Sequence, residues 1–289
     1  MVRARAAAIA AVPGRLLLVT DFDGTLAEIV ADPAAARIVP LARSALRRLA
    51  RSAEARPERL VVALLSGRAS VDVAGRVRVG GVHYLGNHGM EAGLLARGAR
   101  PNGLRVLPTG GGGDATDATW LGDRVADRLD RPPWLFVEIK PPSVAFHFRQ
   151  AQDTEAARRA VLGALEQAGG PPPGRPEHGL EAIEGRRVVE IRPAGSGGKA
   201  VALERLIEDE RPAAVVMLGD DISDAEAFQA LTRARRRSVL VGLAIAVLGV
   251  AETPAWVADS ADLALGSPRD AARVLSLFAR VIESERPSG

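Results

Sequence analysis

Apolar residues cluster along this chain in short continuous runs near both ends and in alternating patterns in the middle. Leu16 to Val19, Leu60 to Leu65 and Ala214 to Leu218 are unbroken apolar runs, each followed by a charged or glycine-containing loop. Such runs are typical of parallel strands buried on both faces. Pro40 to Ala53 instead has the spacing of an amphipathic helix. Further strands are predicted at Val82 to Leu85 and Leu243 to Val247, and further helices at Val71 to Val77, Ala200 to Ile207 and Asp270 to Ile282.

The middle of the chain predicts a smaller α/β layer. Leu135 to Lys140 and Val144 to Arg149 alternate apolar and polar residues across a Pro-Pro-Ser turn, which indicates strands with one face on a core. Helices are predicted at Trp120 to Leu129 and Thr154 to Ala168, and strands at Leu180 to Ile183 and Arg187 to Ile191. The outward residues of these strands are Glu138, Lys140, His147, Arg149, Glu190 and Arg192. An ordinary solvated sheet face would have a similar composition.

The composition changes between Ala99 and Ala118, where Pro, Gly, Asp and Thr dominate. Glycines 110–113 lack the preceding buried strand and the following Gly-Lys-Ser/Thr of a phosphate cradle, so we interpret them as a flexible connection. The predicted fold is α/β, with a doubly wound parallel-sheet, Rossmann-like core and an inserted small α/β cap domain. We assign residues 1–108 and 195–289 to the core and residues 109–194 to the cap.

Composition excludes several classes of function. The chain has no cysteine, which excludes disulfides and thiolate catalysis, and its net charge of +3 does not favour nucleic acid as a partner. No apolar run approaches the roughly 20 residues of a membrane span. Residues 1–15 imitate a signal peptide only faintly, and cleavage after them would cut against the first strand. We therefore expect a cytoplasmic monomer that acts on a small molecule.

The loop after the first strand carries the first candidate chemistry. Asp21 and Asp23 lie at i and i+2, too close for both charges to remain unpaired, so a cation or a shared proton is expected. Asp21 could attack as a nucleophile while Asp23 moves a proton. Thr25 offers a hydroxyl and an N–H to an anion. Two other interpretations are a solvated turn and a calcium loop, although the closing Glu of an EF-hand is missing.

Other strand ends add polar groups. Ser66 and Gly67 follow the second strand and could form part of an anion site or a plain turn. His88, after the third strand, is either a structural histidine or a ligand contact. Lys199 opens a helix after glycines, where N–H groups already favour anions. The carboxylates of Asp220, Asp221 and Asp224 would repel one another unless a divalent cation such as Mg²⁺ neutralised them. Carboxyl ends of parallel strands share one edge, so these groups predict a phosphoryl site.

The order of these motifs resembles that of the haloacid dehalogenase-like phosphohydrolases, in which DFDGT, LLSGR, Lys199 and GDDISD would be the four motifs. DFDGTLAEIV, GNHGME, VEIKPPSVAFHFR, VVEIRP and LGDDISDAEAF are similar to successive signatures of the trehalose-6-phosphate phosphatase family. The resemblance implies hydrolysis of trehalose 6-phosphate to trehalose and phosphate, the last step of trehalose biosynthesis.

The resemblance also implies a role for each matching residue. Asp21 would form an aspartyl-phosphate, and Asp23 would protonate the leaving sugar oxygen and then activate water. Asp21, the main-chain carbonyl of Asp23, and Asp220 would bind Mg²⁺, with Asp221 and Asp224 in support. Phosphate contacts would come from Thr25, Ser66, Gly67 and Lys199. Substrate contacts would come from Asn87, His88, Glu138, Lys140 and Glu190.

Two alternatives share most of these residues. Another capped phosphatase of the superfamily, acting on sucrose, mannosylglycerate or glucosylglycerol phosphate, would differ only in the cap. A non-catalytic sugar-phosphate-binding or regulatory domain would be expected to lack a nucleophile, an acid or a metal ligand, and this chain retains them all.

Overall fold

The chain folds into two compact units, each with its own sheet. The structure, a computed structural model, describes residues 2–30, 32–109, 115–140, 143–185, 187–195, 197–249 and 255–285. Met1–Thr109 and Gly198–Gly289 form the first unit, and Gly110–Gly197 form the second. The glycine run at 110–113, which we interpreted as a connection, lies outside the described residues.

The first unit is built on an eight-stranded sheet with the strand order β12-β11-β10-β1-β2-β3-β4-β5. The parallel strands are β1 (Leu16–Thr20), β2 (Leu60–Leu65), β3 (Val82–Gly86), β10 (Ala214–Gly219), β11 (Val241–Val247) and β12 (Leu263–Leu265). β1 lies in the middle and pairs with β10 and β2. This arrangement confirms the predicted α/β fold with a parallel sheet.

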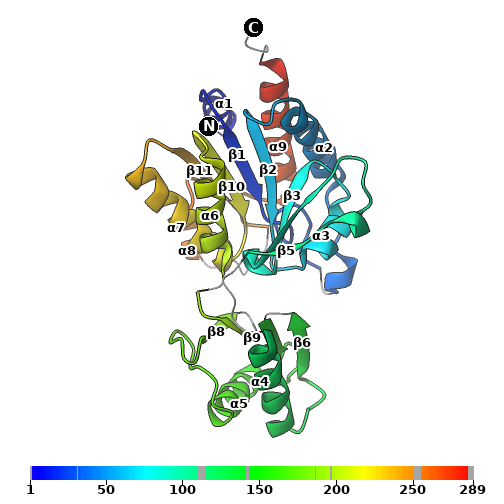
Figure 1. The fold of residues 1–289 in the computed structure, drawn as a ribbon, viewed down its shortest axis with the longest axis vertical. Coiled ribbons are helices and arrows are strands. Elements are labelled where there is room, and N and C mark those ends of the chain that lie inside the picture. Colours follow the sequence, from blue (N-terminus) through cyan, green and yellow to red (C-terminus); the bar gives the residue numbers. More distant parts are fainter. Residues whose placement is uncertain are drawn as a thin grey trace. The chain divides into compact units, whose positions relative to one another are not determined.

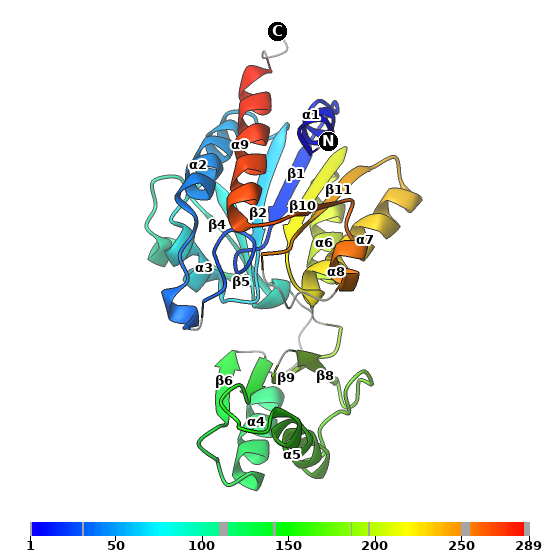
Figure 2. The same cartoon turned by 180° about the vertical axis from the view of Figure 1, so that it is seen from behind.

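Helices cover both faces of this sheet, which explains why its strands are unbroken apolar runs (Figures 1 and 2). Leu16 and Leu18 of β1 pack into one core, whereas Leu17 and Val19 pack into the other. The first core is closed by α1 (Val2–Ala10), α2 (Pro40–Ala55), α3 (Ser70–Val77) and α9 (Pro268–Ser284). The second is closed by α6 (Lys199–Glu210), α7 (Ile222–Arg237) and α8 (Ala255–Asp259).

The sheet extends beyond the strands that the sequence predicted. β4 (Glu91–Leu95) and β5 (Leu107–Pro108) add an antiparallel edge next to β3. The sequence predicted no strand after Leu243 to Val247, whereas β12 follows it and pairs in parallel with β11. These three strands are short and carry no long apolar run, so pairing with a neighbour rather than local pattern determines them.

The second unit has a four-stranded antiparallel sheet with the order β6-β7-β9-β8. Its core contains Val144, Phe146, Val189 and Ile191, which lie on one face of the sheet. Glu138, His147 and Glu190 lie on the opposite face, as alternation predicted. The predicted strand position of Arg149 was wrong, because β7 ends at His147 and Arg149 lies in the turn after it. The elements are α4 (Ala115–Arg128), β6 (Phe136–Lys140), β7 (Ser143–His147), α5 (Thr154–Gln167), β8 (Leu180–Gly185) and β9 (Val188–Pro193).

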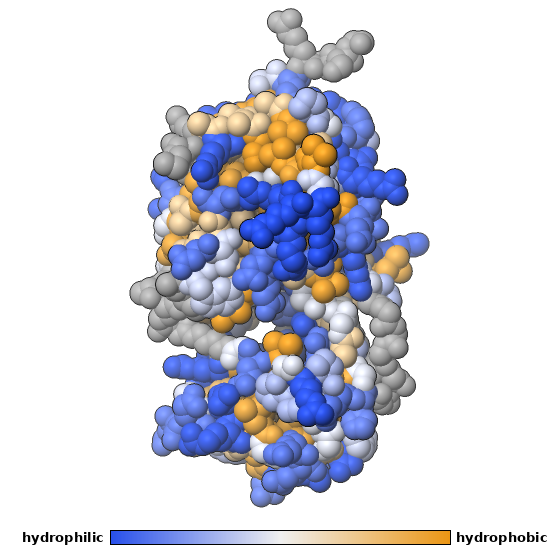
Figure 3. Space-filling view, turned by 90° about the vertical axis from the view of Figure 1, so that its left-hand side faces the viewer, coloured by the Kyte–Doolittle hydropathy of each residue, from blue (hydrophilic) through white to orange (hydrophobic). Residues whose placement is uncertain are grey.

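The arginine-rich segment at residues 233–237 forms the exposed last turns of α7. Strongly hydrophilic residues gather on the side of the first unit where α7 lies (Figure 3). Basic residues at a helix C-terminus interact favourably with the helix dipole and need no ligand. None of the described helices has the length and hydropathy that a bilayer crossing requires.

Gly24 brings the loop after β1 against the loop after β10. Its φ of +75° lies in the left-handed region, and a Cβ at this position would come within 1.9 Å of Asp220 Oδ2. Any side chain would therefore strain the backbone and displace Asp220.

We predict that Gly24→Ala lowers the free energy of unfolding by about 2 kcal/mol or more, because strain and steric overlap act together. Gly75→Ala is the matched control, since Gly75 lies in α3, a Cβ there would meet no atom within 4 Å, and alanine favours a helix. Urea unfolding of both variants measures the difference. Equal stability of the two variants would contradict the requirement for glycine at position 24.

Candidate active site

The ends of four parallel strands bring the predicted residues of the first unit to one edge of the sheet. Asp21 follows β1, Ser66 follows β2, Asn87 follows β3 and Asp220 follows β10. Thr20 pairs with both Leu64 and Leu218, so these three strands end level with one another. Residues nearly two hundred positions apart in the chain therefore become neighbours.

A buried lysine joins two of these loops. Lys199 Nζ lies 2.8 Å from Asp21 Oδ1 and 2.8 Å from Asp224 Oδ1, and Lys199 and Asp224 are almost completely buried. Burial opposes its charge, but the carboxylates around it raise the pKa of Lys199 well above its ordinary value. The ammonium group is therefore charged, and it fixes the orientation of the Asp21 carboxylate.

Asp224 also holds the loop that contains Asp220. Its Oδ2 accepts hydrogen bonds from the N–H groups of Asp220 at 3.0 Å and Asp221 at 3.2 Å. Asp221 in turn accepts a hydrogen bond from the Asp224 N–H at 2.9 Å, which completes a capping box at the start of α7. Gly219 allows this packing, because a Cβ there would lie 2.1 Å from Asp224 Cγ.

The acids at this edge fit a divalent cation. One carboxylate oxygen from each of Asp21, Asp220 and Asp224 can be chosen so that all three lie within 4.8 Å of one another. Burial raises the pKa of Asp21 to about 8, against the lowering effect of Lys199, and burial with the neighbouring charge of Asp224 raises the pKa of Asp220 to about 8. When all three acids are ionised, one lysine leaves two negative charges to neutralise, and carboxylate oxygens are ligands for hard cations.

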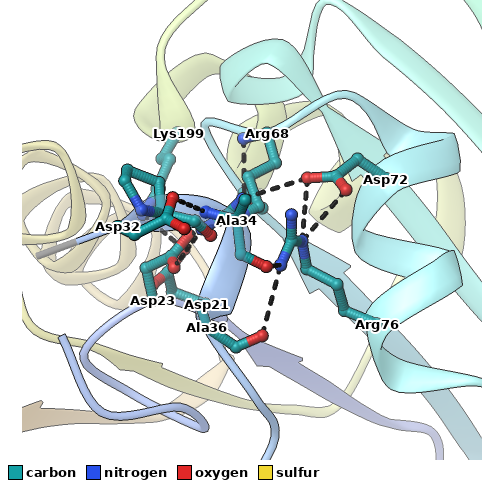
Figure 4. Close-up of polar contacts among 11 residues, drawn as sticks. Asp21, Asp23, Asp32, Ala34, Ala36, Arg68, Asp72, Arg76 and Lys199 are labelled. Atoms are coloured by element: carbon teal, nitrogen blue, oxygen red, sulfur yellow. Dashed lines mark hydrogen bonds and ion pairs between the residues drawn. The ribbon is translucent and has the colours of Figure 1, made fainter. Parts of the chain in front are cut away.

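Thr25 and Asp23 lie beside this cluster. The buried Thr25 hydroxyl donates to Asp220 Oδ1 at 3.0 Å, so in this structure it orients the acid. The side chain of Asp23 points to Arg68 (Figure 4). Arg68 Nε lies 2.6 Å from Asp23 Oδ2 and its Nη2 lies 2.8 Å from Asp23 Oδ1, a bidentate ion pair.

Arg68 is itself held by several partners that sequence reasoning missed. Its guanidinium donates to Asp72 Oδ2 at 3.0 Å and to the Pro33 carbonyl at 2.9 Å. Arg76 binds the other side of Asp72 and the carbonyls of Ala34 and Ala36 (Figure 4). The spacing of Asp72 and Arg76 on α3 was a signal for part of this network, because residues four apart on a helix face one another, but Arg68 precedes the helix and its contacts had no such signal.

Ser66, Gly67, Asn87 and His88 tie the ends of β2 and β3 together. The N–H groups of Asn87 and His88 donate to the carbonyls of Arg68 and Ser66, each at 2.9 Å. A Cβ on Gly67 would lie 2.9 Å from His88 Nε2, so the imidazole lies against this glycine. Among the described residues no hydrogen-bond partner reaches the buried Oδ1 of Asn87, which is thus available to a donor on a ligand.

The remaining predicted residues belong to the second unit. Glu138 and Glu190 are both opposite Ala145 in the strand register, so they share one face of the sheet. His147 Nε2 lies 2.8 Å from Glu138 Oε2. Arg192, predicted to face outward, is buried, and its Nε lies 2.7 Å from Glu181 Oε1. Lys140 ends β6, and its side chain lies outside the described residues.

Comparison with known sequences identifies the family. Residues 19–247 match the family model for trehalose-phosphatase. The trehalose-phosphate phosphatase of Mycobacterium avium (strain 104) is 37% identical over 216 residues, which cover 73% of this chain and 50% of that protein. The chain therefore spans about half the length of the curated relatives it matches.

Solved structures share the fold across nearly the whole chain. The C-terminal domain of Candida albicans trehalose-6-phosphate phosphatase aligns with a TM-score of 0.73 at 20% identity, covering 96% of each chain. The C-terminal domain of the trehalose synthase regulatory protein of the same organism aligns with a TM-score of 0.65 at 14% identity, covering 95% of this chain and 97% of that one. By its family-model match and its sequence relatives, this chain belongs to the trehalose-phosphatase family.

Proposed function

We propose that this protein hydrolyses trehalose 6-phosphate to trehalose and phosphate with the help of Mg²⁺ and through a phosphorylated Asp21. The observation that carries the proposal is the buried contact of Lys199 with Asp21 and Asp224, next to Asp220. A buried nucleophile, a fixed cation and an excess of acidic oxygens together suit phosphoryl transfer. Membership of the trehalose-phosphatase family supports the choice of substrate.

The first half of the reaction transfers the phosphoryl group to the enzyme. A carboxylate oxygen of Asp21 forms a bond to phosphorus as the bond from phosphorus to the sugar oxygen breaks. Lys199 holds the Asp21 carboxylate in place and offsets negative charge that develops on the phosphoryl oxygens. Asp23 gives a proton to the departing sugar oxygen, because an unprotonated alkoxide is high in energy and a poor leaving group.

The second half releases phosphate. Asp23, now ionised, takes a proton from a water molecule as that water attacks phosphorus, and the bond from phosphorus to Asp21 breaks. The bidentate contact with Arg68 suits the ionised form of Asp23 and fixes the plane of its carboxylate. Arg68 is thus a positioning residue, and Asp23 has to loosen this contact before it can donate a proton.

Asp21 and Asp220, with the main-chain carbonyl of Asp23, would hold the divalent cation, and Asp224 would orient the loop around them. Bound there, Mg²⁺ would neutralise charge on the phosphoryl oxygens. Ser66 and Gly67 would contact phosphate, and Asn87, Glu138, Lys140 and Glu190 would contact the sugar. The cytoplasmic location and the monomeric state stay predictions from the sequence.

We predict that trehalose 6-phosphate exceeds sucrose 6-phosphate, glucose 6-phosphate and mannosylglycerate phosphate by orders of magnitude in kcat/KM, measured as phosphate release.

Asp21→Asn should lower kcat about a thousandfold or more because the nucleophile is lost. Asp209→Asn, an exposed acid on α6, is the matched control and should stay active. A different leading substrate would support another capped phosphatase, and full activity of Asp21→Asn would support a regulatory domain.

Removal of divalent cations is expected to abolish phosphate release, since buried acids would then repel the incoming phosphate. Adding Mg²⁺ back should restore the rate, and Asp220→Asn should raise the half-saturating Mg²⁺ concentration about tenfold or more. Titration calorimetry of Mg²⁺ into the apo-protein gives a second readout that does not depend on turnover. Undiminished activity in excess chelator would rule out the metal assignment.

Arg68→Gln tests the positioning of Asp23. Because a positioned acid contributes about 10² to 10⁴-fold only where the leaving group needs a proton, kcat for the sugar phosphate should fall by roughly that factor. Hydrolysis of p-nitrophenyl phosphate, whose leaving group departs as a stable phenolate without a proton, should fall less, because only its second half needs Asp23, as the base. Arg76→Gln is the control, since Arg76 contacts Asp72 but not Asp23. Equal losses on both substrates would show that Arg68 acts in the shared second half or on another group, and not on the proton donation by Asp23.

A further inference from the structure

Four arginines from three segments of the first unit line one pocket away from the strand ends described above. Arg47 and Arg51 lie on α2, Arg78 follows α3, and Arg97 follows β4. The pocket has a volume of about 310 Å³, and Ala50, Val79, Gly80, Gly98 and Ala99 complete its lining. Arg78 precedes β3, and β4 ends opposite the first residue of β3, so the pocket lies at the amino ends of the strands.

The backbone around this pocket is closely packed and well anchored. Gly80 is required, because a Cβ there would lie 2.4 Å from the Ala96 carbonyl oxygen. The Gly81 N–H donates to the Leu95 carbonyl at 2.6 Å, and the buried Tyr84 hydroxyl donates to the Val79 carbonyl at 2.7 Å. These contacts hold the segment that carries Arg78 against the segment that carries Arg97. The arginines therefore extend from a fixed frame.

Positive charge at this pocket is poorly balanced. Of its four arginines, Arg97 is the one for which the described residues provide an ion pair, with Glu54. The charges of Glu283 and Arg51 attract one another without a hydrogen bond between them. Glu283 is already paired with Arg48, whose Nε donates to Glu283 Oε1 at 3.0 Å. Arg43, which donates to the carbonyls of Val77 and Arg76, has a lowered pKa, first from burial and then from the charges of Arg47 and Arg78.

We propose that this pocket binds a small anion with two or more phosphoryl groups. Guanidinium groups bind phosphate oxygens in pairs and remain charged at any physiological pH. Charges that converge from three separate segments suit a ligand with several anionic groups better than a single phosphate. The volume is at the small end of ligand pockets, which span about 300–1,000 Å³, and so suits a compact polyanion.

This inference does not rest on the proposed reaction. The pocket is at the amino ends of the strands, whereas Asp21, Ser66 and Asp220 follow their carboxyl ends. An anion in the pocket therefore would not compete with a substrate at the catalytic edge. Both places bind phosphoryl groups by charge, so the test has to distinguish them.

Calorimetric titration of inorganic tripolyphosphate into chelator-treated full-length protein tests the proposal. We expect one site with a Kd below roughly 1 mM. The double variant Arg47→Gln with Arg51→Gln should weaken binding about tenfold or more, because each lost hydrogen bond involves a charged group. Arg236→Gln with Arg237→Gln removes the same charge from the exposed end of α7 and should stay within about twofold of the wild type.

All four substituted arginines are exposed, so both double variants should fold and hydrolyse p-nitrophenyl phosphate at the wild-type rate. Three results would overturn the proposal. The first is no binding to the wild type, and the second is equal weakening in both double variants, which would show non-specific attraction. The third is unchanged binding in the Arg47/Arg51 variant, which would place the anion elsewhere, for example at the catalytic edge.

Discussion

The contact of Lys199 with Asp21 and Asp224 is the interaction on which the rest of the proposed active site depends. A lysine and acids so deeply buried are tolerable only together, since removal of one partner leaves an uncompensated charge in a medium of low dielectric. The lysine comes from α6, one acid follows β1 and the other opens α7. Their pairing therefore fixes three elements of the first unit relative to one another and orients the Asp21 carboxylate.

That pairing leaves the site with more negative than positive charge, and the imbalance explains its chemistry. The raised pKa values of Asp21 and Asp220 express the cost of holding several buried acids together. A divalent cation at this cluster would remove this cost and would let a negatively charged phosphate approach the acids. Close packing maintains the imbalance, because Gly24 and Gly219 let the acids approach the backbone where any Cβ would push them apart.

Arginine has a contrasting role in the same unit. Arg68 neutralises Asp23 through a planar, bidentate contact and also binds Asp72, so two carboxylates compensate its positive charge. The arginines around Gly80, at the opposite ends of the strands, have few acidic partners. The same side chain thus positions a neighbour in one place and leaves positive charge exposed in another, and the number of acids within reach makes the difference.

The sequence by itself determined the buried parallel strands, most helices and the residues that follow each strand, because apolar periodicity and strand-end motifs are local properties. It did not predict β4, β5 and β12, whose short, mixed segments become strands only by pairing with a neighbour. Nor did it show that Thr25 contacts Asp220, that Arg68 grips Asp23 or that His88 lies on Gly67. Only the tertiary structure decided these contacts, because the direction of a side chain and the charges around it depend on segments that are distant in the chain and meet when the sheet forms.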